Sequence, residues 1–466
     1  MGFVSNDTIA AISTPLGESG IGVVRLSGVK SVDIVSRFFR DSHSQPLQAR
    51  ASHTVYHGRI IEPESNREID EVVLTLFRAP HSYTSEDVIE ISAHGSPLVL
   101  QQILQLMLWA GARLAEPGEF TKRAFLSNRI DLTQAEAVID LIQSQTELAQ
   151  RAAIQQLEGI LSTRIKLISN SLMELLAEWE AHIDFPEEDI PLTTLTHFNS
   201  TLQQVEQHIT ELLASARFGR KLREGVKVPL IGKPNVGKSS LLNAFLQEPR
   251  AIVTPHPGTT RDTIHETINL AGIPFEFIDT AGWRDTADTI EQEGVKRTQT
   301  AVKQADLILL LFDATQHLNT EDYKIIAQVT LFNIPMLVVI NKTDLPTLLT
   351  ELELKSVLPQ TPILRISALT GDGIQALKEA IQTTVTQGEV VSSADKIFIT
   401  NIRHAELLNR TLQNLFAIEK QITTQEPPEI IAAELREAIS HLGEILGTNI
   451  SADLLDRIFS RFCIGK

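Results

Sequence analysis

The feature that most constrains the fold is an eight-residue run, Gly232-Lys-Pro-Asn-Val-Gly-Lys-Ser239, which matches the pattern G-x4-G-K-[ST]. It directly follows a β-branched apolar stretch at 226–231 and precedes a helical pattern at 241–246. In such a loop the backbone N–H groups can surround a phosphate, and a strand and a helix hold its two ends. The run therefore predicts a phosphate-binding loop in an α/β domain.

The rest of the chain divides by hydrophobic pattern. Strand-like segments at 226–231, 275–278, 307–312, 336–340 and 363–366 alternate with helical ones, which is typical of a parallel α/β sheet. Strands at 22–26, 71–77 and 88–92 and a helix at 96–110 are predicted nearer the N-terminus. We expect four parts: an α+β domain at 1–122, a helical part at 123–218, the α/β domain at 219–383, and a second helical part at 384–466. The predicted fold is thus an α/β domain inserted in a helical domain and preceded by an α+β domain.

Two local patterns refine the helical parts. Thr133-Gln-Ala-Glu136 predicts a capping box at a helix start, in which the two side chains accept hydrogen bonds from free backbone N–H groups. A later apolar face is predicted at Leu407, Leu408, Thr411, Leu412, Leu415 and Phe416. The pattern alone does not decide whether the two helical parts pack together.

Composition limits the function. The 41 Lys and Arg against 58 Asp and Glu give a net charge of −17, which excludes a protein that coats nucleic acid by bulk charge. A single cysteine, Cys463, excludes an intramolecular disulfide and a cysteine-based metal cage. The N-terminus lacks a signal-peptide pattern and no apolar run is long enough to cross a bilayer, so we expect a soluble, cytoplasmic protein with no membrane partner.

Three further motifs follow the phosphate loop in a fixed order. Asp279-Thr-Ala-Gly282 comes after the strand at 275–278, Asn341-Lys-Thr-Asp344 ends the strand at 336–340, and Ser367-Ala368 follows the strand at 363–366. The carboxylate of Asp344 can accept two hydrogen bonds from guanine, whereas adenine offers no such pair of donors. Together the four motifs predict GTP binding.

Each motif residue has an expected role. Lys238 reaches the β- and γ-phosphates, the Ser239 hydroxyl binds Mg²⁺, and Asp279 holds Mg²⁺ through water. The Gly282 N–H can contact a γ-phosphate, and the Ala368 N–H can bind guanine O6. The predicted nucleotide contacts are Asn235, Val236, Gly237, Lys238, Ser239, Ser240, Thr254, Thr259, Thr260, Asp279, Gly282, Asn341, Lys342, Asp344, Ser367 and Ala368.

The sequence leaves hydrolysis open. Where Ras-like GTPases carry a water-orienting Gln, this chain has Trp283. Hydrolysis is therefore either lost or supported by another group. Gly258-Thr-Thr-Arg-Asp262 is typical of a switch that closes over the γ-phosphate, with Thr260 as a second Mg²⁺ ligand, although a Gly- and Thr-rich loop can also be an ordinary surface loop.

The phosphate loop, the Gly258–Asp262 run and Asp279-Thr-Ala-Gly-Trp283 are similar to those of the TrmE-Era-EngA-like GTPases. Within that group the chain resembles the MnmE (TrmE) family of tRNA wobble-uridine modification GTPases. That resemblance rests on Pro117-Gly-Glu-Phe-Thr-Lys-Arg-Ala-Phe125, Leu222-Arg-Glu-Gly225 and the final Phe462-Cys-Ile-Gly-Lys466, and it runs along the whole chain.

The resemblance implies a homodimer that acts with the FAD-dependent protein MnmG, in a heterotetramer or larger complex, on wobble uridine 34 of certain tRNAs. It implies a carboxymethylaminomethyl or aminomethyl group added at C5, with the carbon from 5,10-methylene-tetrahydrofolate or a formyl-folate analogue. It also implies hydrolysis activated by K⁺, bound at Asn235, Thr254, His256 and Thr259, with Glu291 orienting water.

The family's folate contacts correspond to Arg25, Glu90, Arg129 and Lys466. Arg and Lys suit the folate carboxylates, and Glu90 suits the amino-pyrimidine edge. Arg129 stands where relatives have Lys, which keeps the charge but changes the donor geometry. The resemblance also implies a chemical role for Cys463, although a lone cysteine is more often a small apolar residue.

Two other functions fit parts of the sequence. One is a regulatory GTPase switch in ribosome assembly, although such relatives carry an RNA-binding module or a second GTPase domain that this chain does not show. The other is a structural dimerisation protein with residual GTP binding, which the intact Lys238, Ser239 and Asp279 disfavour.

Overall fold

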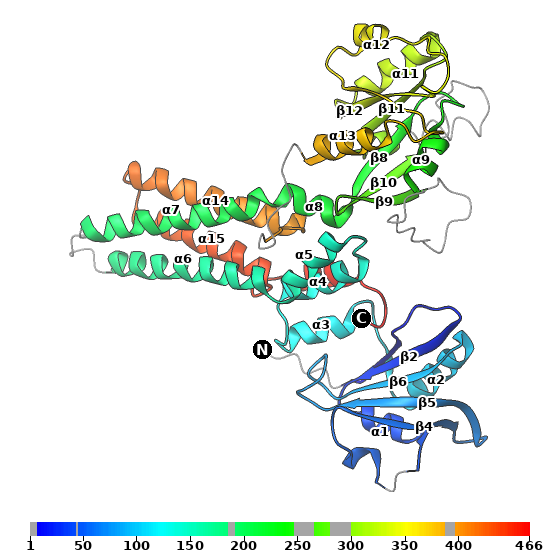
Figure 1. Cartoon of the computed structure of the whole chain (residues 1–466). Coiled ribbons are helices and arrows are strands. Elements are labelled where there is room, and N and C mark those ends of the chain that lie inside the picture. The colour runs from blue at the N-terminus through cyan, green and yellow to red at the C-terminus, as the bar shows by residue number, and fades with distance from the viewer. Residues whose placement is uncertain (1–6, 43–44, 185–191, 247–264, 280–299, 387–396) are drawn as a thin grey trace. The chain divides into compact units, whose positions relative to one another are not determined.

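The computed structural model of the chain describes residues 7–42, 45–184, 192–246, 265–279, 300–386 and 397–466. It divides into two compact units (Figure 1). Unit 1 comprises Met1–Ile139, Gln155–Glu206 and Arg410–Lys466, and unit 2 comprises Asp140–Ile154 and Gln207–Asn409.

A seven-stranded sheet in unit 1 has the order β3-β4-β5-β6-β2-β1-β7. Neighbouring strands are antiparallel except β1 and β7, which are parallel. The strands are β1 (Ile9–Ile12), β2 (Ser19–Ser27), β3 (Phe39–Arg40), β4 (Thr54–Glu62), β5 (Arg67–Phe77), β6 (Val88–Gly95) and β7 (Arg113–Leu114). With them lie α1 (Ser31–Ser36), a 3-10 turn (Leu47–Ala49) and α2 (Pro97–Trp109).

Burial in this sheet alternates along the strands. In β5, Val72, Leu74 and Leu76 are buried at every second position, and α2 adds Ile103 to the same core. One face of the sheet is therefore covered. The three strands predicted here are present as β2, β5 and β6, each longer than predicted. The predicted helix is present as α2, with closely similar bounds. In the β2–β6 pair, Arg25 lies directly opposite Glu90.

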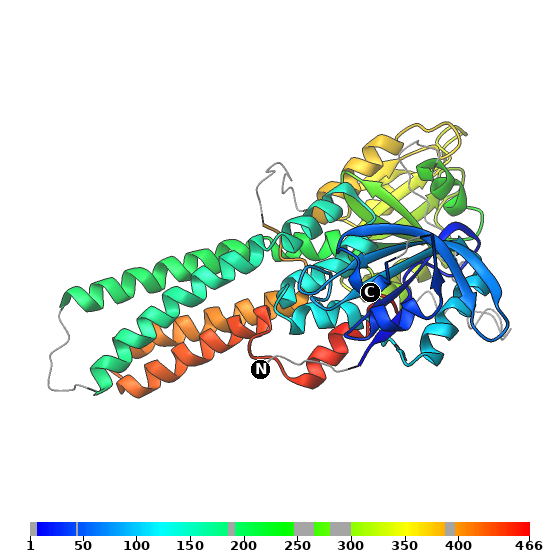
Figure 2. The ribbon, with the colours of Figure 1, turned by 90° about the horizontal axis from the view of Figure 1, so that it is seen from below.

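Helices make up the rest of unit 1 (Figures 1 and 2). They are α3 (Glu119–Leu126), α4 (Leu132–Gln143), α5 (Glu147–Leu157), α6 (Ile160–Asp184), α7 (Leu192–Ala214), α14 (Ile402–Thr423), α15 (Pro428–Leu446) and α16 (Ala452–Phe459), of which α4, α5, α7 and α14 continue into unit 2. The indole Nε1 of Trp179 in α6 donates to Pro428 O at 2.9 Å, and Arg436 of α15 pairs with Glu180 at 2.6 Å. The two helical parts, which are distant in sequence, therefore pack together.

Two of the local predictions are wrong. Helix α4 begins at Leu132, and its capping box is formed by Asp131 and Gln134: Asp131 Oδ1 accepts from Gln134 N at 3.1 Å, and Gln134 Oε1 accepts from Asp131 N at 3.0 Å. Thr133 already lies inside the helix, where its hydroxyl bonds that of Ser162. Phe416, predicted on the buried face of α14, is 53% exposed because Leu415 and Ile418 fill the core positions.

Unit 2 contains a six-stranded sheet of order β13-β12-β11-β8-β10-β9. All its neighbours are parallel except β9 and β10. Its elements are α8 (Ala216–Glu224), β8 (Val226–Ile231), α9 (Lys238–Leu246), β9 (His265–Leu270), β10 (Ile273–Asp279), β11 (Ile308–Asp313), α11 (Thr320–Thr330), β12 (Met336–Asn341), α12 (Glu351–Val357), β13 (Ile363–Arg365) and α13 (Ile374–Thr386).

Every residue of β11 is buried, as expected for a strand covered on both faces of a parallel sheet. The five predicted strands coincide with β8, β10, β11, β12 and β13 to within two residues at each end. The antiparallel edge strand β9 was not predicted. The predicted fold class, with an α/β domain inserted in helical segments and preceded by an α+β part, is confirmed.

Candidate functional site

The loop between β8 and α9 has the backbone that a phosphate-binding loop requires. Gly237 has a φ of 97°, and a Cβ there would lie 2.2 Å from Asn341 Nδ2, so only glycine fits. Asn235 also has a positive φ, of 66°, and Val236 is buried. The loop thus turns tightly between the strand and the helix and presents successive N–H groups.

Lys238 begins α9 and folds back over this loop. Its Nζ donates to Gly232 O at 2.8 Å and to Lys233 O at 3.0 Å, and the residue is 8% exposed. Burial lowers the pKa of Lys238, and the nearby Asp279 carboxylate opposes that shift. The ammonium group is thus held at the phosphate loop, where a β- or γ-phosphate would be its natural counter-charge.

The two predicted magnesium groups lie together. Ser239 Oγ donates to Asp279 Oδ2 at 3.0 Å, which joins the start of α9 to the end of β10. A hydroxyl and a carboxylate are oxygen ligands of the kind Mg²⁺ prefers, and they leave room for water and phosphate oxygens. These residues fit the metal. Among the described residues, no group of three or more His, Cys, Asp or Glu could hold a metal ion, so a metal here would depend on water and phosphate oxygens as further ligands.

The base-recognition motifs meet the phosphate loop through one buried amide. Asn341, 2% exposed, donates from Nδ2 to Val236 O at 2.9 Å and accepts at Oδ1 from Ala368 N at 3.0 Å. Ser367 Oγ donates to Asp344 Oδ1 at 2.6 Å, which orients that carboxylate. The structure therefore brings together the predicted contacts Asn235, Val236, Gly237, Lys238, Ser239, Asp279, Asn341, Lys342, Asp344, Ser367 and Ala368. The predicted contact Ser240 follows Ser239 in α9 and its side chain is exposed.

Several predicted site residues lie outside the described residues. They are Thr254, His256, Thr259, Thr260, Gly282 and Glu291. The predicted switch, the potassium contacts and the water-orienting acid remain predictions, and of the potassium contacts only Asn235 lies among the described residues.

Sequence reasoning missed two aspartates beside the nucleotide motifs. Asp313, at the end of β11, accepts from Lys342 Nζ at 2.6 Å, and Asp322, in α11, accepts from Lys233 Nζ at 2.7 Å. Burial tends to raise the pKa of Asp313, but hydrogen bonds from Lys342 and Thr315 outweigh it and the pKa is lowered. The only signal for these residues was an acidic side chain at each end of the β11–α11 connection.

A second polar cluster lies in unit 1. Arg25 pairs with Glu90 at 2.7 Å, and its Nη1 donates to Gly465 O at 3.2 Å. Gly465 has a φ of 95°, and a Cβ there would lie 2.5 Å from Ile12 O. The final residues of the chain can approach β1 and β2 this closely only because position 465 is glycine.

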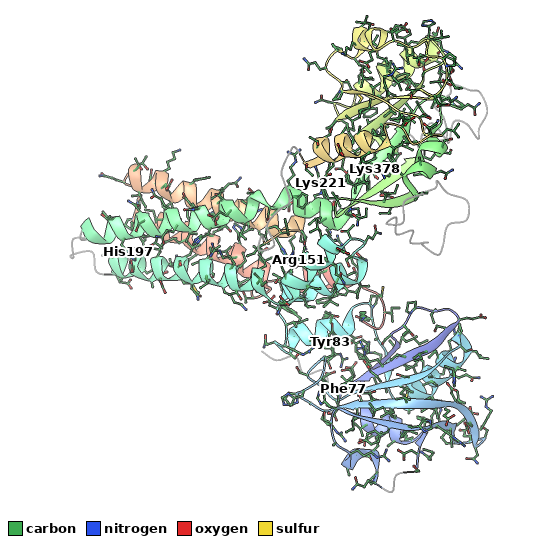
Figure 3. All side chains as sticks on the ribbon, viewed as in Figure 1. Phe77, Tyr83, Arg151, His197, Lys221 and Lys378 are labelled. Atoms are coloured by element: carbon green, nitrogen blue, oxygen red, sulfur yellow. The ribbon has the colours of Figure 1, made fainter. Side chains whose placement is uncertain are left out.

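Tyr83, from the β5–β6 connection (labelled in Figure 3), links the cluster to Arg129. Arg129 Nη1 donates to Tyr83 O at 2.7 Å, and its guanidinium lies 5.3 Å from the Tyr83 ring centroid. The Arg25 guanidinium lies 5.8 Å from the same ring. Sequence reasoning missed Tyr83, because an aromatic residue in a polar loop carries no motif of its own.

The last four residues complete this cluster. Burial and the Arg25 charge lower the pKa of Lys466, while Glu90 and Cys463 act to raise it. Cys463 is exposed, and its backbone O accepts from Gly118 N at 3.3 Å. Arg25, Glu90, Arg129 and Lys466 were predicted as folate contacts, with Cys463 close to Lys466 in the chain, and the four segments that carry these residues meet here.

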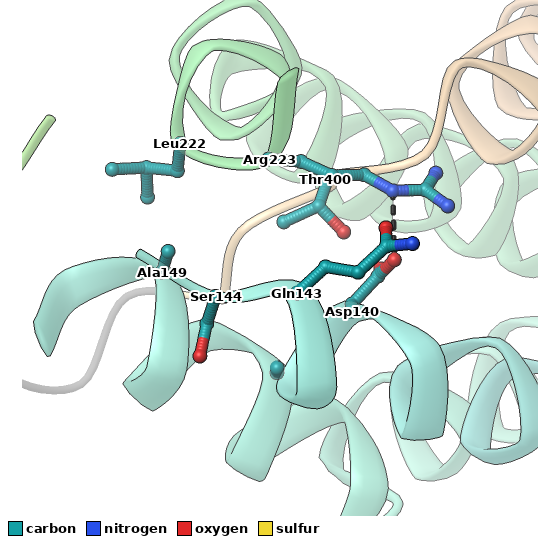
Figure 4. A pocket seen from close by; sticks show the side chains of 8 residues that line it. Asp140, Gln143, Ser144, Ala149, Leu222, Arg223 and Thr400 are labelled. Carbon is teal, nitrogen blue, oxygen red and sulfur yellow. Dashed lines mark ion pairs between the residues drawn. The ribbon is translucent and has the colours of Figure 1, made fainter. Parts of the chain in front are cut away.

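Unit 2 also has a pocket away from the nucleotide motifs (Figure 4). Its empty space is about 350 Å³ including the open mouth. Arg223 Nε of α8 pairs with Asp140 Oδ1 of α4 at 2.8 Å in its lining, and Thr400 is drawn beside Arg223. Separately, among the described helices none is long and apolar enough to cross a membrane.

The fold and the four sequence motifs define a P-loop protein that binds GTP with Mg²⁺. Two family models match, one described as GTP-binding protein TrmE N-terminus at residues 8–129 and one as MnmE helical domain at residues 132–463. The chain belongs to the MnmE family of tRNA modification GTPases, and it is therefore a GTP hydrolase that acts in tRNA modification.

Curated relatives match along their full length. A tRNA modification GTPase MnmE of Thermoanaerobacter pseudethanolicus is 45% identical over 99% of both chains, and one of Lactiplantibacillus plantarum is 42% identical over 99% of this chain and 98% of its own. Among solved structures, a variant of Era from Aquifex aeolicus bound to GDP and AlF4⁻ is 30% identical, covers 40% of this chain and 65% of its own, and has a TM-score of 0.30.

Proposed function

We propose that this GTPase works in the cytoplasm as a homodimer with the FAD-dependent protein MnmG. Together they add a carboxymethylaminomethyl or aminomethyl group at C5 of uridine 34 in certain tRNAs. A folate, 5,10-methylene-tetrahydrofolate or a formyl analogue, supplies the one-carbon unit when bound. The GTP cycle of unit 2 drives the complex and is activated by K⁺.

The observation that carries the proposal is the cluster of Arg25, Glu90, Arg129 and Lys466 in unit 1. Its members suit a folate because three cations match the carboxylates of the glutamate tail and one carboxylate matches the amino-pyrimidine edge. Glu90 is paired with Arg25 at 2.7 Å, and this ion pair orients its carboxylate. The exposed Cys463 lies in the same final turn of chain as Lys466, which supports a role for its thiol beside the folate.

Folate binding can be tested directly on the full chain. Titration with 5-formyltetrahydrofolate should give an affinity about tenfold weaker in Arg25→Gln, because one charge-assisted contact is lost. Arg59→Gln is the matched control, since it removes an arginine from an exposed pair with Glu68 on the same sheet. Equal affinity in both variants would remove Arg25 from the folate site.

The proposed potassium activation rests on Asn235, whose backbone has the positive φ of the phosphate loop, together with Thr254, His256 and Thr259. A cation there could neutralise developing phosphate charge, as an arginine finger does in other GTPases. We expect GTP turnover to be markedly faster in KCl than in NaCl at equal ionic strength, and Asn235→Ala to remove the difference. Glu291→Gln should slow turnover without changing GTP affinity, as expected of a water-orienting acid.

The modification itself is tested by mass spectrometry of tRNA from cells that lack this protein. Loss of the C5 group at uridine 34, restored by the wild-type gene but not by Asp279→Ala, is the expected result. Unaltered uridine 34 would instead favour a GTPase switch without modification chemistry. Co-purification of MnmG with the tagged chain tests the partner separately.

A further inference from the structure

The segment 313–322 comprises the last residue of β11, the β11–α11 connection and the first turn of α11, and it lies outside all four nucleotide motifs. It nevertheless begins and ends with a buried carboxylate: Asp313 is 8% exposed and Asp322 is 3% exposed. Each of these carboxylates holds a lysine that belongs to a different nucleotide motif. Buried acidic side chains are rare unless they are paired, so each aspartate depends on its lysine partner.

At one end, Asp322 holds the phosphate loop. Its Oδ2 accepts from Lys233 Nζ at 2.7 Å and also from Asn319 N at 3.0 Å, which is half of the capping box of α11. Lys233 is the second residue of the phosphate loop, and its carbonyl oxygen accepts from Lys238 Nζ. The rigid start of a helix is thus linked through Lys233 to the lysine that contacts phosphate.

At the other end, Asp313 pairs with the loop that carries the guanine motif Asn341-Lys-Thr-Asp344. Its Oδ2 accepts from Lys342 Nζ at 2.6 Å, while its Oδ1 accepts from the Thr315 backbone and hydroxyl at 2.9 and 2.7 Å. Lys342 has a φ of 66°, so its backbone stays in an uncommon conformation. The neighbouring Ala314 N donates to Asn341 O at 2.8 Å, which adds a backbone tie to the same loop.

We propose that the β11–α11 connection is a brace that positions the two halves of the nucleotide site. Asp322 is a positioning residue for the phosphate half through Lys233, and Asp313 is a positioning residue for the guanine half through Lys342. Neither touches the nucleotide itself. The physical basis is that a charge-assisted hydrogen bond in a buried setting is strong and geometrically strict.

The two ends of the brace act on different parts of the ligand, so nucleotides that differ by one group can separate them. The preference for GDP over GMP reports the phosphate half. The preference for GDP over inosine diphosphate, which lacks the 2-amino group, reports the base half. A substitution that only loosens the whole domain would lower affinity for all three nucleotides together.

The test is competition binding of GDP, GMP and inosine diphosphate to the full-length protein in Mg²⁺. Asp322→Asn should reduce the GDP-over-GMP preference about tenfold and leave the GDP-over-inosine preference within about twofold of the wild type. Asp313→Asn should do the reverse.

The control is Glu351→Gln in the first turn of α12, whose partner Lys355 is 3.9 Å away and exposed. It removes a carboxylate from the same unit without touching either loop, and both preferences should stay unchanged. If the asparagine variants do not fold, Asp322→Glu and Asp313→Glu, which keep the charge but displace it, replace them. The proposal fails if the aspartate variants change both preferences alike, or change neither more than the control does.

Discussion

Asn341 is the best place to perturb the site, because one buried amide joins the phosphate loop to both base-recognition loops. Its Nδ2 donates to Val236 O and its Oδ1 accepts from Ala368 N, at 2.9 and 3.0 Å. Asn341→Asp keeps the size and the acceptor but removes the donor. The substitution therefore tests a single hydrogen bond with little change in packing.

The expected cost follows from burial. Val236 O would be left facing a carboxylate oxygen inside the protein, and an unsatisfied buried polar group costs about 1–3 kcal/mol. If that cost destabilises the phosphate-loop conformation that binds GDP, GDP affinity should drop about 10- to 100-fold. Burial would also raise the pKa of the new carboxyl, and its protonated form can donate to Val236 O. The defect should therefore be smallest at acidic pH and grow as pH rises.

The assay measures the GDP affinity and the urea unfolding of the purified variant at acidic pH and at increasing pH. Asn269→Asp is the matched control, because Asn269 Oδ1 accepts from Gly272 N at 2.8 Å and this hydrogen bond, made within the described residues, survives the same exchange. Wild-type GDP affinity in Asn341→Asp, or an equal loss in both variants, would refute the linking role of the Nδ2 donor.

Three further outcomes are expected. Burial, with Glu419 nearby, raises the pKa of Glu206 to about 7 from 4.5, so the folded state holds the proton more tightly and loses stability as pH rises through that window. Since Glu206 is partly exposed, we expect a loss of about 1–2 kcal/mol, absent in Glu206→Gln, in denaturant unfolding at pH 5 and pH 8; a flat wild-type profile would contradict it. Asp344→Asn should shift preference from GTP toward xanthosine triphosphate in competition binding, and unchanged GTP affinity would show that the base assignment is wrong. Asp131→Ala should destabilise unit 1 by about 1 kcal/mol through loss of the α4 cap, and unchanged denaturant unfolding would contradict that cap.

The strands of unit 2 were predictable because their signals are local. Near-continuous apolar runs such as β11 indicate strands buried on both faces, and the motif loops at their ends are set by short-range spacing. The edge strand β9 carries a weaker, mixed pattern and was missed. The capping-box error has a similar origin, since Thr133 with Glu136 and Asp131 with Gln134 both match the pattern, and only the backbone shows which pair begins the helix.

The sequence by itself determined the class of nucleotide site and the family, because both depend on motifs in which neighbouring residues act together. Only the tertiary structure decided which distant residues support those motifs. Asp322 is 89 residues from Lys233, and Arg25 is 440 residues from Gly465, so no local pattern could pair them. Buried charges are stable only beside a partner, and the partner is fixed by how the strands and helices pack in space.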